Sequence, residues 1–132
     1  MLFKFEVTTH ERNEFVNIDS YVEDARLKSG ILNGIITVFT PHTTAGITIN
    51  ENADPDVVKD LVFGMNQTFD NKKEYRHFEG NSDSHMKSSL TGASETLILE
   101  DGSILYGTWQ SVYFAEFDGP RTRKIFIKVI EG

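Results

Sequence analysis

Short runs of apolar and β-branched residues, each ended by a turn signal, recur along this sequence. The first two, residues 2–7 and 15–18, flank a polar stretch and predict a β-hairpin. Residues 34–39 are apolar enough to predict a strand buried on both faces. The remaining predicted strands cover residues 45–50, 96–99, 109–117 and 124–130, and a short apolar piece at 104–106 precedes a break at Gly107. This succession of hairpins indicates antiparallel sheets rather than a doubly wound parallel fold.

Two segments carry helix signals. Residues 20–23 have the Ser-x-x-Glu spacing of a capping box and predict a helix of about ten residues that ends at Gly30. Asp54 followed by Pro55 predicts the start of a second helix, which is amphipathic and runs to about residue 70. The resulting order, ββ-α-ββ-α-βββ, predicts an α+β fold with about seven strands and two main helices.

Length and composition limit the kind of protein further. A chain of 132 residues forms one domain, residues 1–132, and buries roughly two thirds of its unfolded surface. The net charge of −7 repels nucleic acid, and no run of apolar residues is long enough for a membrane span or a signal peptide. We therefore expect a cytoplasmic protein with a small-molecule partner. Because there is no cysteine, any metal ion has to be held by His and carboxylate side chains.

The segment from 71 to 93 breaks the pattern, with only a possible helical turn at 83–90. It contains His77 and His85, while His42 follows a predicted strand. Neutral imidazoles are common metal ligands, and three of them leave a coordination position open for water or substrate. His77 and His85 lie too far apart for one helical face, so they converge only if the segment folds back. The alternative is that each histidine is an ordinary surface or hydrogen-bonded side chain.

Two carboxylates near these histidines are candidate catalytic groups. Glu51 precedes the second helix, where it is either a general acid/base or an anion beside the helix N-terminus. Asp83 either orients a ligating imidazole or caps the helical turn that contains Lys87.

Three basic residues are candidates for binding an anionic substrate. Arg121 and Arg123 follow a Gly-Pro turn, and Lys87 lies in the polar segment. Arginine binds phosphate through two parallel hydrogen bonds, so these residues predict an anion-binding patch. They equally fit a charged sheet edge that prevents aggregation. Asn52, beside Glu51, is also predicted to bind the substrate.

Four segments together resemble the YjbQ family of small proteins, also called secondary thiamine-phosphate synthases: residues 42–56, 80–90, 107–110 and 116–121. The resemblance extends over essentially the whole chain. It implies an antiparallel β-sandwich and assembly as a homotrimer. It also implies a divalent metal ion, typically zinc, at His42, His77 and His85.

The function that this resemblance implies is a metal-binding enzyme with thiamine-phosphate synthase activity, which joins a pyrimidine pyrophosphate to a thiazole phosphate. A second reading is a zinc-dependent hydrolase of a small phosphorylated or heterocyclic metabolite, because three imidazoles and zinc lower the pKa of a bound water. A third is a non-catalytic trimeric protein that binds a metabolite or a metal. Whether the three histidines meet within one subunit or between subunits stays open at this point.

Overall fold

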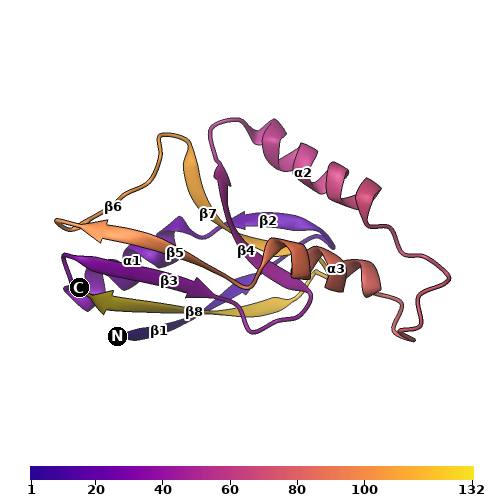
Figure 1. Cartoon of the computed structure of the whole chain (residues 1–132), viewed down its shortest axis with the longest axis horizontal. Coiled ribbons are helices and arrows are strands. Elements are labelled where there is room, and N and C mark those ends of the chain that lie inside the picture. The colour runs from indigo at the N-terminus through magenta and orange to yellow at the C-terminus, as the bar shows by residue number, and fades with distance from the viewer.

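A computed structural model describes residues 1–132 and contains two antiparallel sheets (Figure 1). The larger sheet has the strand order β1-β8-β3-β5-β6 and the smaller one the order β2-β7-β4. Their strands are β1 (Leu2–Thr8), β2 (Glu14–Asn17), β3 (Gly34–Phe39), β4 (Ala45–Glu51), β5 (Ser94–Glu100), β6 (Ser103–Ile104), β7 (Gln110–Glu116) and β8 (Thr122–Glu131). The α+β class predicted from the sequence is confirmed.

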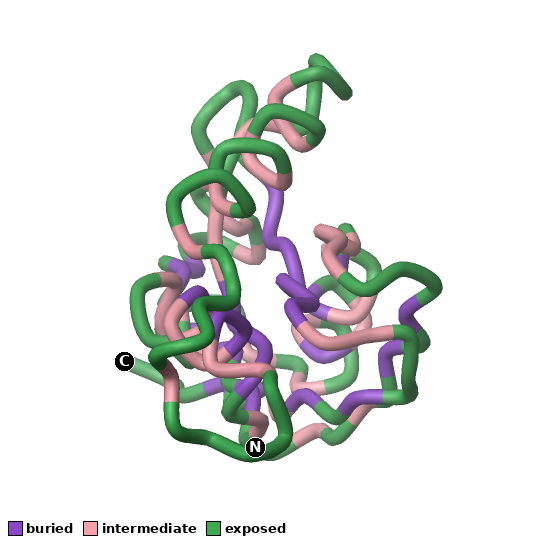
Figure 2. The backbone as a smooth tube through the Cα atoms, turned by 90° about the vertical axis from the view of Figure 1, so that its right-hand side faces the viewer, coloured by how far each residue is buried: buried purple, intermediate pink, exposed green.

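One hydrophobic core lies between the sheets. Alternation along each strand points one set of side chains inward, so that Ile36 of β3 and Ile127 of β8 pack with Ile47 of β4 and Phe114 of β7. Helix α1 (Asp19–Ser29) adds Val22 and Ala25 to the same core. Buried residues therefore gather in the body of the molecule (Figure 2).

Helix α1 confirms one predicted signal and corrects another. Gly30 ends the helix in the left-handed conformation, with φ of 68°, as expected for a C-terminal glycine. The predicted capping box is wrong, because the helix begins two residues earlier, at Asp19, and its N-cap is Ile18. Asn17 replaces the expected Ser20 cap: its side-chain oxygen accepts the N–H of Asp19 at 2.9 Å.

Helix α2 (Pro55–Thr68) extends away from the sheets (Figures 1 and 2). It begins as predicted: Asp54 is the N-cap, and its carboxylate accepts the N–H of Asp56 at 2.9 Å. Its apolar stripe lies on one side but is only half-buried, and no residue of α2 is fully buried in this subunit. No helix of the chain is long and apolar enough to cross a membrane.

Two further expectations need correction. The segment predicted as loop with a short turn contains a third helix, α3 (Ser82–Thr91), which packs on β4. Strand β3 is not buried on both faces, because nothing covers the outer face of the larger sheet and Ile35 and Phe39 are exposed there. Helix α3 carries His85 to the end of the sheets at which β4 begins.

Candidate functional site

A wholly polar pocket of about 360 Å³ lies where α3 approaches the β3–β4 connection and the start of β8. None of the ten residues that line it is hydrophobic. Five of them were predicted as functional, and the structure brings these five together: His42, His77, His85, Arg121 and Arg123. The other five are Thr43, Thr44, Glu79, Asn81 and Asp118.

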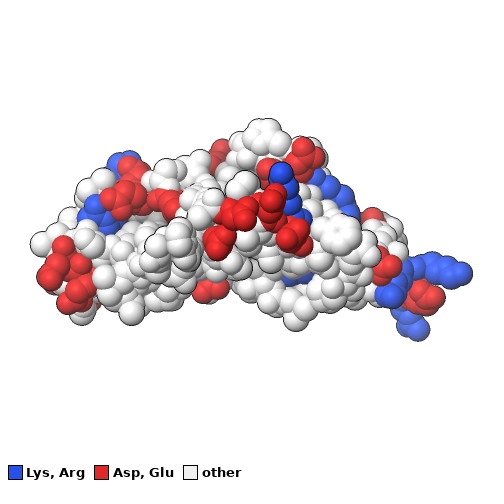
Figure 3. All heavy atoms as spheres, turned by 90° about the horizontal axis from the view of Figure 1, so that it is seen from above, with Lys and Arg blue, Asp and Glu red and all other residues white.

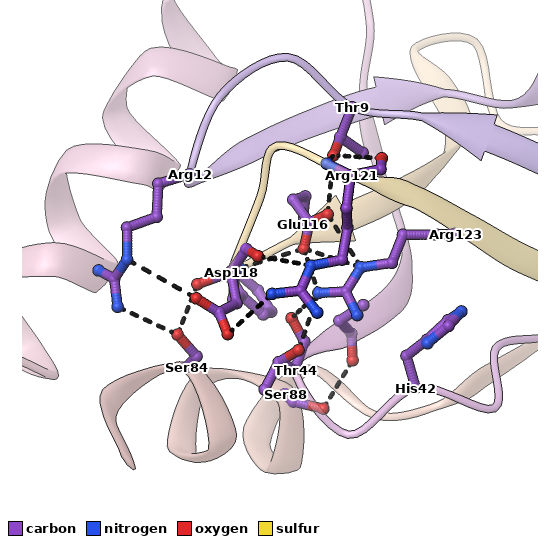
Figure 4. Close-up of polar contacts among 12 residues, drawn as sticks. Thr9, Arg12, His42, Thr44, Ser84, Ser88, Glu116, Asp118, Arg121 and Arg123 are labelled. Carbon is purple, nitrogen blue, oxygen red and sulfur yellow. Dashed lines mark hydrogen bonds and ion pairs between the residues drawn. The ribbon is translucent and has the colours of Figure 1, made fainter. Parts of the chain in front are cut away.

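A buried ion pair holds Arg123 at the wall of this pocket (Figure 4). Its Nε donates to Glu116 Oε1 at 2.9 Å, and its Nη2 donates to Thr44 Oγ1 at 2.8 Å. The side chains of Arg123 and Glu116 are 3% and 0% exposed, so the pair is shielded from solvent. Because Nη1 of Arg123 makes no hydrogen bond within the chain, it remains available to a ligand.

Glu116 is the ionised partner in this pair. Burial raises the pKa of a carboxyl group, but hydrogen bonds from Arg123, from the N–H of Asp118 and from the hydroxyl of Thr9 outweigh that effect. The net result is a pKa of Glu116 below its ordinary value. The carboxylate therefore stays charged and fixes the guanidinium of Arg123.

Arg121 is fixed less tightly, on the exposed side of the pocket. Its Nε donates to the carbonyl oxygen of Asp118 at 2.9 Å, and its Nη2 lies 3.3 Å from Asp118 Oδ2. Asn81 donates to the same carboxylate oxygen at 2.9 Å, which links the start of α3 to the β7–β8 turn. Oδ1 of Asn81 is buried and has no hydrogen-bond partner in the chain.

His42 is a neutral hydrogen-bond donor in this arrangement. Its Nε2 accepts the backbone N–H of Lys124 at 2.9 Å, so the ring proton of the neutral form lies on Nδ1. Burial, followed by the nearby charge of Arg123, lowers the pKa of His42 below its ordinary value. Because Nε2 already accepts the N–H of Lys124, only Nδ1 of His42 is left to contact a ligand.

The predicted three-histidine metal centre is wrong for this structure. His77 and His85 do come together, with ring centroids 5.4 Å apart and an edge-to-face angle of 87°. However, Nε2 of His42 is occupied by Lys124, and no group of three or more His, Asp or Glu side chains is arranged to hold a metal ion. The side chains of this chain therefore do not fit the zinc ion that the resemblance implies.

Asp83 and Lys87, predicted as a catalytic and a substrate-binding residue, do not line the pocket. Both are buried on the inner side of α3. Asp83 accepts two hydrogen bonds from Arg12, at 3.1 and 3.2 Å. Nζ of Lys87 donates to Asn13 at 3.1 Å and to Asn66 of α2, and burial lowers its pKa. In this subunit both connect α3 to neighbouring segments, and their predicted roles stay predictions.

Glu51 and Asn52 lie at the other end of β4. The backbone oxygen of Glu51 and the side chain of Asn52 accept hydrogen bonds from the hydroxyl of Tyr113, at 3.0 and 3.1 Å. Asn52 also lines a small separate cavity of about 210 Å³ with Trp109 and Gln110. The catalytic role of Glu51 and the substrate-binding role of Asn52 also stay predictions.

Sequence reasoning missed Glu116, Thr44 and Asp118. The signal available for Glu116 was a charged residue at the end of the largely apolar strand β7, in which every residue except Gln110 is buried. A buried carboxylate requires a cationic partner, and Arg123 is the cation that the β7–β8 turn returns to the same place. No sequence pattern indicates the contact of Thr44 with Arg123.

Comparison with known proteins places the chain among its relatives. A family model described as UPF0047 protein YjbQ-like matches residues 3–132. UPF0047 protein MJ1081 of Methanocaldococcus jannaschii is 49% identical over 130 residues, which cover 98% of this chain and 94% of that protein. UPF0047 protein YugU of Bacillus subtilis is 48% identical over 131 residues, which cover 98% of this chain and 99% of that protein.

Solved structures agree with the fold. The crystal structure of an uncharacterized conserved protein of the yjbq/upf0047 family from Clostridium acetobutylicum is 48% identical, with a TM-score of 0.95, and the match covers 97% of this chain and 99% of that one. Hypothetical protein APE1520 from Aeropyrum pernix is 28% identical, with a TM-score of 0.94, over 100% of this chain and 99% of that one.

These comparisons correct the expected activity. The relatives are described as UPF0047 or uncharacterised proteins, and none of these descriptions carries a thiamine-phosphate synthase or a metal-dependent activity. Together with the absence of a metal-binding group, this overturns the metal-dependent enzyme expected from the sequence. What the match over residues 3–132 does show is descent: the chain belongs to the YjbQ/UPF0047 family.

Proposed function

We propose that the polar pocket binds a small molecule through an anionic, phosphate-like group. The observation that carries this proposal is the composition of the pocket wall: two arginines and three histidines, with no hydrophobic residue among its ten members. Arg123 supplies Nη1, and neutral His42 supplies its Nδ1 proton. Donors held in place before a ligand arrives favour binding of an oxyanion, because they need little reorganisation.

The location of the pocket strengthens this assignment on a protein of net charge −7. On the face seen in Figure 3, Asp and Glu lie in several groups, and Lys and Arg lie among them, with a prominent group at the end where Figure 1 places the α2–α3 connection. The pocket itself holds Arg123 with little solvent around it, where a charge is screened less than at the open surface. Glu116 and Asp118 offset the charges of Arg123 and Arg121, so an anion would be held by the N–H donors of the pocket rather than by a net positive charge.

Binding of inorganic phosphate tests the proposal. We expect Arg121→Gln to weaken phosphate binding about tenfold or more in isothermal titration calorimetry, because a hydrogen bond to a charged group contributes about 1.5–3 kcal/mol. Arg26→Gln is the matched control: it removes the same charge from α1, where Arg26 pairs with Glu23. Equal affinities for the wild type and Arg121→Gln, or an equal loss in Arg26→Gln, would contradict the proposal.

We also propose that the chain assembles as a homotrimer, as the family resemblance implies. Support comes from the uncovered outer face of the larger sheet, where Ile35 lies in register with Ile98 on one side and Ile130 on the other. All three side chains are exposed in the single subunit. A contiguous apolar patch of this kind marks an interaction surface. The cytoplasmic location expected from the sequence stays a prediction.

The mass of the protein in solution tests the assembly. We expect the wild type to have three times the 15.0 kDa mass of one chain in light scattering. Ile35→Lys is expected to give single chains, because it places a charge at the centre of the patch. Leu27→Lys, at an exposed position of α1, serves as the control and should keep the wild-type mass. A wild type with the mass of one chain, or Ile35→Lys with the wild-type mass, would rule out this interface.

A further inference from the structure

A second cavity, of about 450 Å³, lies along one face of α3. Five of its six lining residues come from α3 and are spaced as one helical face: Ser82, His85, Met86, Ser89 and Leu90. The sixth is Phe69, the C-cap of α2, so the end of α2 contributes one side chain to the lining. Phe69, Met86 and Leu90 make this an apolar groove, in contrast to the polar pocket.

The groove and the polar pocket meet at His85, which lines both. In the pocket it shares the lining with the two arginines and the other histidines. In the groove it shares the lining with Met86 and Leu90, and Leu90 is 70% exposed. A molecule that contacts His85 from the pocket therefore has an apolar surface directly beside it.

We infer that the ligand of the polar pocket is an amphipathic anion, a phosphate monoester whose apolar body lies in the groove. This inference rests on the proposed function and adds the class of ligand. The anionic group satisfies the donors of Arg121, Arg123 and His42, and the apolar body removes the surfaces of Met86 and Leu90 from water. Binding sites commonly combine a few convergent polar groups with an apolar wall in this way.

Continuity with the pocket favours a small ligand over a protein segment in the groove. The groove lining contains no Asp, Glu, Lys or Arg that would recognise a charged peptide. Its one ionisable side chain, His85, faces the pocket as well. An occupant that uses both surfaces thus carries a negative charge at one end and apolar atoms next to it.

Comparing phenyl phosphate with inorganic phosphate, both as dianions at about pH 8, isolates the contribution of the groove. We expect the wild type to bind phenyl phosphate at least about tenfold more tightly in calorimetry, since the phenyl ring adds apolar contact area. Leu90→Gln combined with Met86→Gln should reduce this preference to less than about threefold and leave the affinity for inorganic phosphate unchanged. Leu27→Gln is the matched control, an exposed leucine on α1 that should keep the full preference.

The outcomes separate the two proposals. If inorganic phosphate binds and depends on Arg121 but phenyl phosphate binds no more tightly, the ligand class is wrong and the anion pocket stands. If neither ligand binds, the proposed function fails and this inference fails with it. If the Met86 and Leu90 replacements change the mass of the protein in solution and leave the preference intact, the groove is a contact between subunits, which also overturns the inference.

Discussion

Replacing Glu116 with Gln is expected to lower the free energy of unfolding by about 3–5 kcal/mol, the cost of breaking a buried ion pair by removing one partner. The guanidinium of Arg123 would remain buried beside a neutral amide, without its counter-charge. Gln retains the shape of Glu and one acceptor oxygen, so the loss reports the charge rather than a cavity. Urea denaturation followed by circular dichroism measures it, provided that the urea dependence of the two proteins is the same.

The pH dependence of the stability difference between the wild type and Glu116→Gln identifies the carboxylate of Glu116 as the source of that difference. Because the pKa of Glu116 is lower in the folded protein than in the unfolded chain, its contribution is fully present above the unfolded value of about 4.3. The contribution falls off below the unfolded value and is lost as the pH passes through the lower folded pKa, so the stabilities of the wild type and Glu116→Gln should approach each other steadily as the solution is made more acidic.

An exposed pair provides the control for Glu116. Glu23 pairs with Arg26 on the surface of α1, and the side chain of Glu23 is 49% exposed. Surface pairs contribute about 0–1 kcal/mol, so Glu23→Gln should cost less than about 1 kcal/mol at every pH. A Glu116→Gln protein that behaves like Glu23→Gln would show that the buried pair does not stabilise the fold.

Strand positions were predictable because most of their signals are local. Alternation and turn residues located every strand of more than two residues, and Asp54 and Gly30 marked a helix start and a helix end correctly. Helix α3 was predicted only as a possible helical turn at 83–90, because its inner face is polar: it buries Asp83, Ser84 and Lys87, so no apolar periodicity indicates a full helix there. These buried polar side chains are satisfied by partners distant in sequence, which no local pattern records.

The outer face of β3 was misjudged for a related reason. Its β-branched, apolar sequence is typical of a strand covered on both sides, yet the single subunit covers only one side. An apolar run in a sequence does not show whether its side chains are covered within the chain or form an exposed interaction surface.

The sequence predicted which residues form the candidate site better than it predicted what those residues do. Residue type and position singled out His42, His77, His85, Arg121 and Arg123, which the fold brings to one pocket. Metal ligation failed as a prediction because it depends on which ring nitrogen is free. Nε2 of His42 accepts the backbone N–H of Lys124, 82 residues away in sequence, which leaves the ring proton on Nδ1.

The turn that carries Arg121 depends on a close approach between two connections. Gly119, between β7 and β8, donates its N–H to the carbonyl oxygen of Arg12 at 3.0 Å. A Cβ at position 119 would lie 2.3 Å from the backbone oxygen of Glu11 and 2.9 Å from Oγ1 of Thr9. The first contact involves backbone, which cannot rotate away, so any side chain at this position has to push the β1–β2 connection aside.

Gly119→Ala is therefore expected to lower the free energy of unfolding by about 3 kcal/mol, at the upper end of the usual cost of overpacking. It should also weaken phosphate binding, because the displaced turn holds Arg121 and because Thr9 hydrogen-bonds both Glu116 and Arg121. Gly64→Ala is the matched control with the opposite sign: nothing lies within 4 Å of a Cβ there, and alanine in the middle of α2 should stabilise the protein by about 0.5–1 kcal/mol. If denaturation shows the two variants to be equally stable, the close packing of the two connections does not determine the geometry of the pocket.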